Sequence, residues 1–237
     1  MSPAEARAKL DAIAPDTGLT DEELAARLTE RARQAPSTIG LRARLQSDMR
    51  QRPAHAGTVG PVNRLRSRQR DDVDTAAAPG DGEDWVKMPK GKYPGDFFYY
   101  PSSTLGINHG HVGLFRRSRL VVEAANKKTG VRKIRTSKRR VPDNETFYFW
   151  IHASGQTDEE DFVDQLAAAK WGRARVGADY RPWWMSTNKS LKAPFNCSQL
   201  IWAAYKKRGI NLDNNGGDHV FPVNIVQDSE TTPYKQV

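Results

Sequence analysis

The sequence predicts an α+β domain in its second half, in which an antiparallel sheet packs on a helix that bears a reactive side chain. Every Trp, Tyr and Phe of the chain lies beyond residue 84, so the large core-forming side chains are confined to this part. Aromatic and β-branched runs at 95–100, 111–115, 119–125 and 146–151 are typical of strands. Helical patterns follow the last run, and this order favours an α+β domain over an alternating α/β one.

Residues 1–50 are predicted to form a short helical N-terminal extension. Capping-box patterns begin at Ser2 and Thr20, and Leu41, Leu45 and Met49 form an apolar stripe with helical spacing. These faces are narrow, so we expect a helical hairpin or a docking arm rather than an independent core.

Residues 51–84 are predicted to be a flexible linker. They carry Pro, Gly, Ala, Arg and Asp, with almost no large apolar side chains. The composition changes near residue 84, which places the main domain at 85–237. Within this domain, 131–140 is a basic, weakly alternating segment that is interpreted as an edge strand.

Two helices are expected after the strands. Thr157 and Glu160 form a capping box at the start of the first, with Phe162, Leu166 and Ala169 on its inner face. The second begins with Asn196, a good N-cap residue, so that Cys197 occupies the first helical position and Gly209 closes the C-terminus.

Composition restricts the class of protein. No run of 18 apolar residues occurs, so no transmembrane segment is predicted, and the N-terminus lacks the apolar region of a secretory signal. We therefore expect a cytoplasmic protein by default, or one exported by a non-classical route. The single cysteine excludes an internal disulfide framework and a cysteine-rich zinc site.

The net charge of +9 is concentrated in one part of the chain. Residues 85–140 hold 14 basic and 2 acidic side chains, a surplus typical of contact with a polyanion such as nucleic acid, an anionic membrane or an acidic cell-wall polymer. A solvated basic face that keeps the protein soluble explains the charge equally well, because few aromatic residues are interleaved for base stacking.

Cys197 is the candidate nucleophile. A thiol at a helix N-terminus faces the positive end of the helix dipole and free backbone N–H groups, and both favour the thiolate. A small buried hydrophobic residue is the alternative interpretation.

A base and an orienting group are expected at His111 and Glu123. If Arg116, Arg117 and Ser118 form a three-residue loop between two strands, His111 faces Glu123 on the same side of the hairpin. The carboxylate would then fix the tautomer of the ring and support the imidazolium. A strand-end histidine bonded to backbone and a solvent-facing glutamate are the alternatives.

Four segments resemble a known family. GDFFYY, HVGLF, VVEAA and the run NCSQLIWAAYKKRGINLD, followed by FPVNIVQDS, are similar to the circularly permuted branch of the NlpC-like papain-fold cysteine hydrolases, the YiiX- and YaeF-like proteins. The resemblance covers roughly 93–230 and implies a papain-like domain in which the histidine strand precedes the cysteine helix. It implies Cys197 as nucleophile, His111 as base and Glu123 as the third member, with Tyr180 lining the substrate cleft.

The function expected from this pattern is thiol-dependent hydrolysis of an amide or ester bond through an acyl-enzyme. Backbone N–H groups at Cys197 or Ser198 would hold the oxyanion. The resemblance favours an amide substrate, for example a cell-wall peptide, and keeps an acyl-lipid hydrolase or acyltransferase open. A non-catalytic basic module that binds nucleic acid or an anionic membrane is the alternative from a different class.

The remaining candidates are weaker. Trp183 and Trp184 form either an aromatic wall for a sugar or acyl chain, or ordinary packing. His152 lies near the cleft or ends a strand, and His55 falls in the linker. His109, two residues before His111, is interpreted as a loop residue; no clear cysteine or carboxylate set completes a zinc site, so neither a metal nor another cofactor is predicted.

Overall fold

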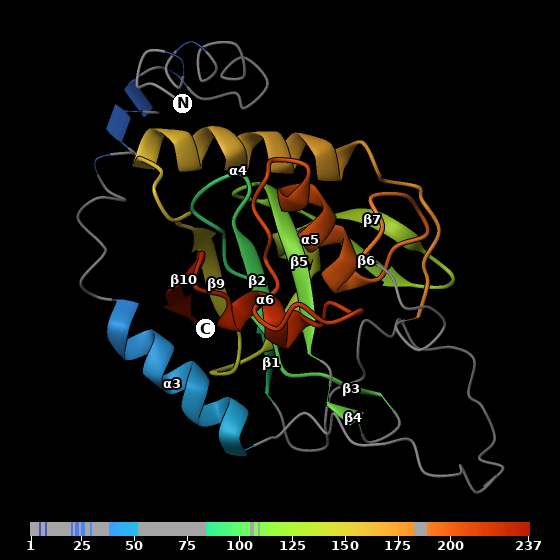
Figure 1. Ribbon diagram of the computed structural model, residues 1–237. Helices are drawn as coiled ribbons and strands as arrows, with labels where there is room; N and C mark the ends of the chain where they lie inside the picture. Colours follow the sequence, from blue (N-terminus) through green and yellow to red (C-terminus); the bar gives the residue numbers. More distant parts are fainter. Residues whose placement is uncertain are drawn as a thin grey trace, which may run out of the picture.

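The computed structural model of the chain describes residues 38–51, 84–104, 107–108, 110–182 and 189–237, together with single positions before residue 30 (Figure 1). Its central feature is a six-stranded antiparallel sheet in the order β10-β9-β2-β5-β6-β7. The strands span Phe97–Tyr100 (β2), His111–Arg117 (β5), Leu120–Asn126 (β6), Gly130–Arg135 (β7), Phe147–Ile151 (β9) and Thr231–Gln236 (β10). The predicted α+β class with an antiparallel sheet is confirmed.

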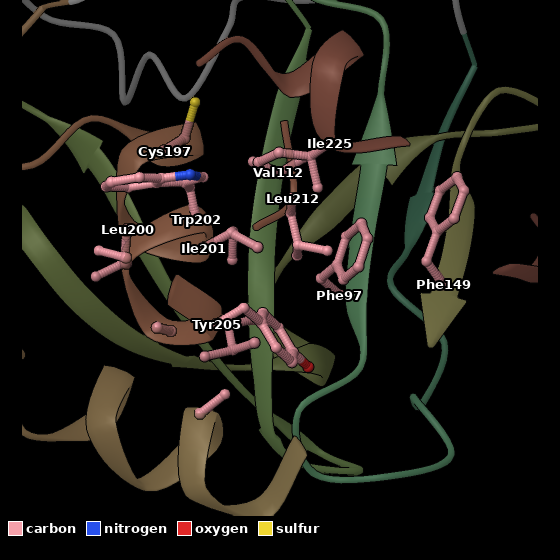
Figure 2. Packing of buried hydrophobic residues seen from close by; sticks show 14 of the residues in the cluster. Phe97, Val112, Phe149, Cys197, Leu200, Ile201, Trp202, Tyr205, Leu212 and Ile225 are labelled. Atoms are coloured by element: carbon pink, nitrogen blue, oxygen red, sulfur yellow. The ribbon is translucent and has the colours of Figure 1, made fainter. Parts of the chain in front are cut away.

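Two helices pack against this sheet. Helix α4 (Asp158–Arg173) begins at the predicted capping box, in which the Thr157 hydroxyl accepts from the Glu160 backbone N–H. Helix α5 (Cys197–Lys206) packs on β5 and β6 (Figure 1). The core between α5 and the sheet contains Leu114, Val122 and Leu200, all fully buried. Figure 2 shows how α5 residues meet the aromatic side chains of the sheet.

A second buried cluster lies on the other side of the same strands. It combines Phe98 and Phe115 from the sheet with Val141 of β8 (Arg140–Pro142) and residues of α4. Strand β8 pairs with β1 (Trp85–Lys87), which forms a separate two-stranded sheet. A further pair joins β3 (Ser103–Thr104) to β4 (Ile107–Asn108). Burial on both faces explains why β2, β5 and β9 read as nearly continuous apolar runs rather than alternating ones.

The basic segment 131–140 divides into three pieces. β7 is the last strand of the sheet, which agrees with the predicted edge strand; a 3₁₀ turn (Thr136–Lys138) and then β8 follow. Among the described residues, the side chains at this edge alternate between half-buried Arg132 and Ile134 and exposed Lys133 and Arg135.

The two elements that follow α5 were not anticipated from the sequence. The C-terminal tail forms β10, an edge strand paired with β9, and FPVNIVQ contains a short helix, α6 (Pro222–Gln227). Helix α3 (Thr38–Gln51) contacts β10, and Leu45 from its predicted stripe is buried in the main core. Only single positions of the predicted helices before residue 37 are described, but they include the predicted capping box at Thr20: the Thr20 backbone N–H donates to the Glu23 carboxylate over 2.9 Å, and the Glu23 N–H donates to the Thr20 hydroxyl over 3.1 Å. Most of the linker 51–84 lies outside the described residues. No described helix has the length and hydropathy needed to span a bilayer.

Candidate active site

Cys197 is the first residue of α5, as the capping pattern predicts. The side-chain oxygen of Asn196 accepts a hydrogen bond of 2.7 Å from the Gln199 backbone N–H, which closes the first turn. Figure 2 shows the Cys197 sulfur pointing away from the apolar residues that hold the helix, such as Leu200 and Ile201. The thiol is therefore fixed by a rigid element while its reactive atom lies at the margin of the core.

The helix start also supplies donors. Asn196 accepts from Gln199, and its own carbonyl accepts from the Leu200 N–H. The backbone N–H groups of Cys197 and Ser198 have no acceptor within the part of the chain that the structure describes. Free N–H groups at a helix N-terminus attract an anion, so these two can stabilise negative charge that forms beside the sulfur.

His111, the first residue of β5, lies between the thiol and a carboxylate. Its Nε2 donates to Glu123 Oε2 over 2.9 Å, and Cys197 lies close enough to the ring to raise its pKa. Nδ1 is the ring nitrogen that remains for the sulfur once Nε2 is engaged. The structure thus brings together the three residues selected from the sequence, with Glu123 fully buried.

The register behind the predicted His111–Glu123 contact was wrong. Strands β5 and β6 pair Leu114 with Val122 and Phe115 with Val121, and a bulge lies between Phe115 and Arg117. The tight turn is shorter than the assumed three-residue loop, so Glu123 is a diagonal rather than a direct neighbour of His111. The even offset keeps both side chains on one face, and diagonal neighbours remain within reach of long side chains.

Two arginines complete the surroundings of Glu123. Arg132, its direct partner on β7, donates to Oε1 from Nε at 3.0 Å and from Nη2 at 2.9 Å. Arg139 Nε lies 3.2 Å from Oε1 and 3.3 Å from Oε2, and its Nη2 donates to the Tyr100 hydroxyl over 2.8 Å. The Tyr100 ring lies against the His111 ring, with 5.3 Å between the centroids. The carboxylate is therefore compensated on three sides.

These contacts shift the protonation of both buried members. Burial alone would lower the pKa of His111, but Tyr100, the nearby Cys197 and the hydrogen bond with Glu123 raise it to about 10. Burial would raise the pKa of Glu123; the charge of Arg139, followed by His111 and Arg132, instead holds it far below the usual range. At neutral pH the site combines an imidazolium with an ionised carboxylate.

The three predicted substrate-binding residues lie in different surroundings, and one of them falls outside the described residues. Burial, and then the charge of Cys197, raise the pKa of the half-buried Tyr180, so its phenol lies within electrostatic range of the thiol. The Ser198 hydroxyl is buried and donates to the Val220 carbonyl over 2.7 Å, so only its backbone N–H remains for a substrate. Trp183, with its neighbour Trp184, lies outside the described residues.

In the described part of the chain no other histidine is hydrogen-bonded to the Cys197 sulfur, and the His219 ring stacks on Phe221 with 5.8 Å between the centroids. His152 is exposed and hydrogen-bonded through Nδ1 to Asp161, 3.0 Å away. His55 and His109 fall outside the described residues. Among the residues that are described, the group whose donor atoms could surround a metal is His152, Asp158 and Asp161, within 4.8 Å of one another. Asp161 already accepts from His152 and the Ala153 N–H.

Arg132, Arg139 and Tyr100 are the functional neighbours that sequence reasoning missed. The sequence does contain a signal for the two arginines. Both belong to the basic segment, and Glu123 is one of 2 acidic residues within 85–140. A buried carboxylate surrounded in sequence by cations requires pairing, which is a usable signal. The β6–β7 hairpin, which closes at Gly130, would then have placed Arg132 opposite Glu123.

Comparison with known proteins finds one informative likeness. No family model matches the chain, and no solved structure matches it. The chain is 35% identical over 140 residues to the uncharacterized protein YycO of Bacillus subtilis (strain 168), an alignment that covers 58% of this chain and 54% of the relative. The chain thus spans about half the length of that curated relative, whose name states no activity. Function must be argued from the geometry of the site.

Proposed function

We propose that the protein is a thiol-dependent hydrolase that cleaves an amide or ester bond by way of an acyl-enzyme. The observation that carries the proposal is the His111 ring, which is hydrogen-bonded to the buried Glu123 carboxylate and lies within interaction range of the Cys197 thiol. A nucleophile, a base and a group that orients the base are what covalent acyl transfer needs.

In the first half-reaction the Cys197 thiolate attacks the carbonyl carbon of the substrate. The oxyanion that forms is placed for the free N–H groups of Cys197 and Ser198 at the start of α5. The His111 imidazolium then gives its proton to the departing amine or alcohol, which leaves an acyl group on sulfur and a neutral ring.

In the second half-reaction the neutral His111 ring removes a proton from water, and the resulting hydroxide equivalent attacks the thioester. Collapse of this intermediate releases a carboxylic acid and returns the thiolate–imidazolium pair. Glu123 acts through His111 in both halves, because its carboxylate holds Nε2 and favours the protonated ring.

The permuted papain-like fold of the NlpC-like hydrolases is part of this proposal. Its support is the chain order, with the histidine strand β5 before the cysteine helix α5, and the packing of α5 directly on β5 and β6. That family likeness favours an amide in a cell-wall peptide as substrate, with an acyl-lipid ester as the other member of the same chemical class.

The test compares the wild-type protein with Cys197→Ala on both substrate types. Cell-wall peptide fragments and acyl-lipid vesicles are each incubated with the two proteins, and released products are identified by mass spectrometry. We expect product only with the wild type, together with a mass increase on Cys197 when the reaction is quenched early. Equal release by Cys197→Ala, or absence of any acylated protein with every substrate of both types, would contradict the proposal.

One surface favours a second, non-catalytic contact with a polyanion. Exposed cations gather on the β5–β6 and β6–β7 turns and along β7, and they are not among the residues that surround Glu123. These residues are Arg117, Arg119, Lys127, Lys128, Lys133 and Arg135. Association with anionic vesicles or nucleic acid that falls steeply with salt, unchanged in Cys197→Ala, would show that this contact is independent of the thiol.

A further inference from the structure

We infer that Arg139 is a positioning residue of the candidate active site: it keeps the buried Glu123 carboxylate ionised and directed at the His111 ring. The inference rests on the proposed function and adds a residue to it. Among the described residues Arg139 forms hydrogen bonds with Glu123 and Tyr100 and none with the sulfur or the ring nitrogens, so its action must pass through those two residues.

The geometry sets Arg139 apart from its neighbours. Its side chain is 6% exposed and its Nε lies within 3.3 Å of both oxygens of Glu123, whereas the Arg132 bonds described above go to Oε1. The same guanidinium donates to the Tyr100 hydroxyl, which fixes the ring that lies against His111. Arg139 is therefore bonded to two groups that contact the imidazole, from β6 and from β2.

The charges explain why this residue matters. Glu123 has no exposed surface, and an uncompensated carboxylate in such a place takes up a proton. The groups that face it are His111 from β5, Arg132 from β7 and Arg139 after the 3₁₀ turn. Of these, Arg139 makes the largest contribution to lowering the pKa of Glu123. Beyond the imidazole lies the Cys197 thiol on α5.

Loss of the Arg139 charge is expected to raise the pH at which Glu123 takes up a proton. A neutral carboxyl group no longer favours the imidazolium that stabilises the thiolate. The reactive form of Cys197 would then disappear at a higher pH on acidification than in the wild type. A purely structural role would lower the reactivity equally at all pH values and leave the midpoint unmoved.

The experiment follows alkylation of Cys197 by iodoacetamide as a function of pH. The chain has a single cysteine, so loss of free thiol reports this site alone, and no substrate is needed. Full-length wild type is compared with Arg139→Gln and with Arg139→Lys, which keeps the charge. Arg140→Gln is the matched control, since Arg140 is exposed and its side chain bonds the Trp85 carbonyl instead of Glu123.

We expect Arg139→Gln to move the acid midpoint of the profile upward by about one pH unit, which corresponds to roughly tenfold slower alkylation below the midpoint. Arg139→Lys should restore most of the shift, and Arg140→Gln should match the wild type. A folded Arg139→Gln protein with an unmoved midpoint, or an equal shift in Arg140→Gln, would overturn the inference.

Two further measurements keep the outcome decisive. If thermal unfolding shows that Arg139→Gln does not fold, Arg132→Gln serves in its place, because Arg132 is the more exposed partner. It should shift the midpoint in the same direction by a smaller amount, and no shift would refute the charge argument. Wild type that alkylates no faster than a model thiol on the acid side would contradict the proposed function. Normal wild-type reactivity with unchanged variants would contradict only the role of Arg139.

Discussion

Replacement of Glu123 by glutamine tests whether a buried charge cluster exists. The substitution keeps the shape of the side chain and removes the negative charge with which the Arg132 and Arg139 guanidinium groups are paired. Leaving buried charges without their partner typically costs about 3–5 kcal/mol, a large part of the roughly 5–15 kcal/mol by which domains are stable. For a chain of this size, each kcal/mol corresponds to about 2–4 °C in melting temperature, so we expect a decrease of roughly 10 °C near neutral pH.

The assay is thermal unfolding followed by circular dichroism over a range of pH. The pKa of Glu123 is lowered in the folded protein, so its contribution to stability is complete above its ordinary value of 4.5 and is lost as the pH falls below it. The difference between wild type and Glu123→Gln should therefore narrow under acidic conditions. Glu159→Gln, at an exposed position on α4, is the control and should change the melting temperature little. A decrease below about 2 °C for Glu123→Gln would refute the arrangement of charges described above.

Three further predictions follow from the same structure. His111 has a pKa raised from 6.5 to about 10, so its contribution to stability is complete below pH 6.5 and lost toward pH 10; the melting temperatures of wild type and His111→Gln should converge over that interval. In Gly113→Ala the new Cβ would lie 2.4 Å from the Phe98 ring, and we expect a loss of about 1–3 kcal/mol in denaturant unfolding, whereas unchanged stability would mean that the ring can move freely. Thr157→Ala removes the cap of α4 and should cost about 1 kcal/mol in the same assay, with Thr129→Ala in an exposed turn as the comparison.

The parts of the fold that sequence reasoning reached are those with local signals. Asn196 before Cys197, and Thr157 with Glu160, are patterns in which the capping atoms lie within a few residues of the groups that they satisfy. The strand around His111 was found because it is buried on both faces and reads as a continuous apolar run.

The parts that sequence reasoning missed depend on contacts between distant segments. The strand at 231–236 contains a proline, which weakens the local signal for a strand, and it is held in the sheet by its pairing with β9. A bulge near Arg117 makes the hairpin register differ from the predicted one, and no residue type in that turn predicts a bulge. The predicted contact between His111 and Glu123 is nevertheless present, because the register differs by an even number of residues and both side chains stay on the same face of the sheet.

The position of the charged residues along the chain affects the order in which the protein folds. His111, Glu123, Arg132 and Arg139 come from consecutive strands and the turn after them, whereas Cys197 arrives with a helix much later in the sequence. Closing short loops costs less entropy than closing long ones, so the carboxylate meets its cations in hairpins that form early. Pulse-labelled hydrogen exchange during refolding should thus find β6 and β7 amides protected before those of α5. Glu123 and its cationic partners are then in place before Cys197 packs against them, so Glu123 is not buried without its cations at any stage of folding.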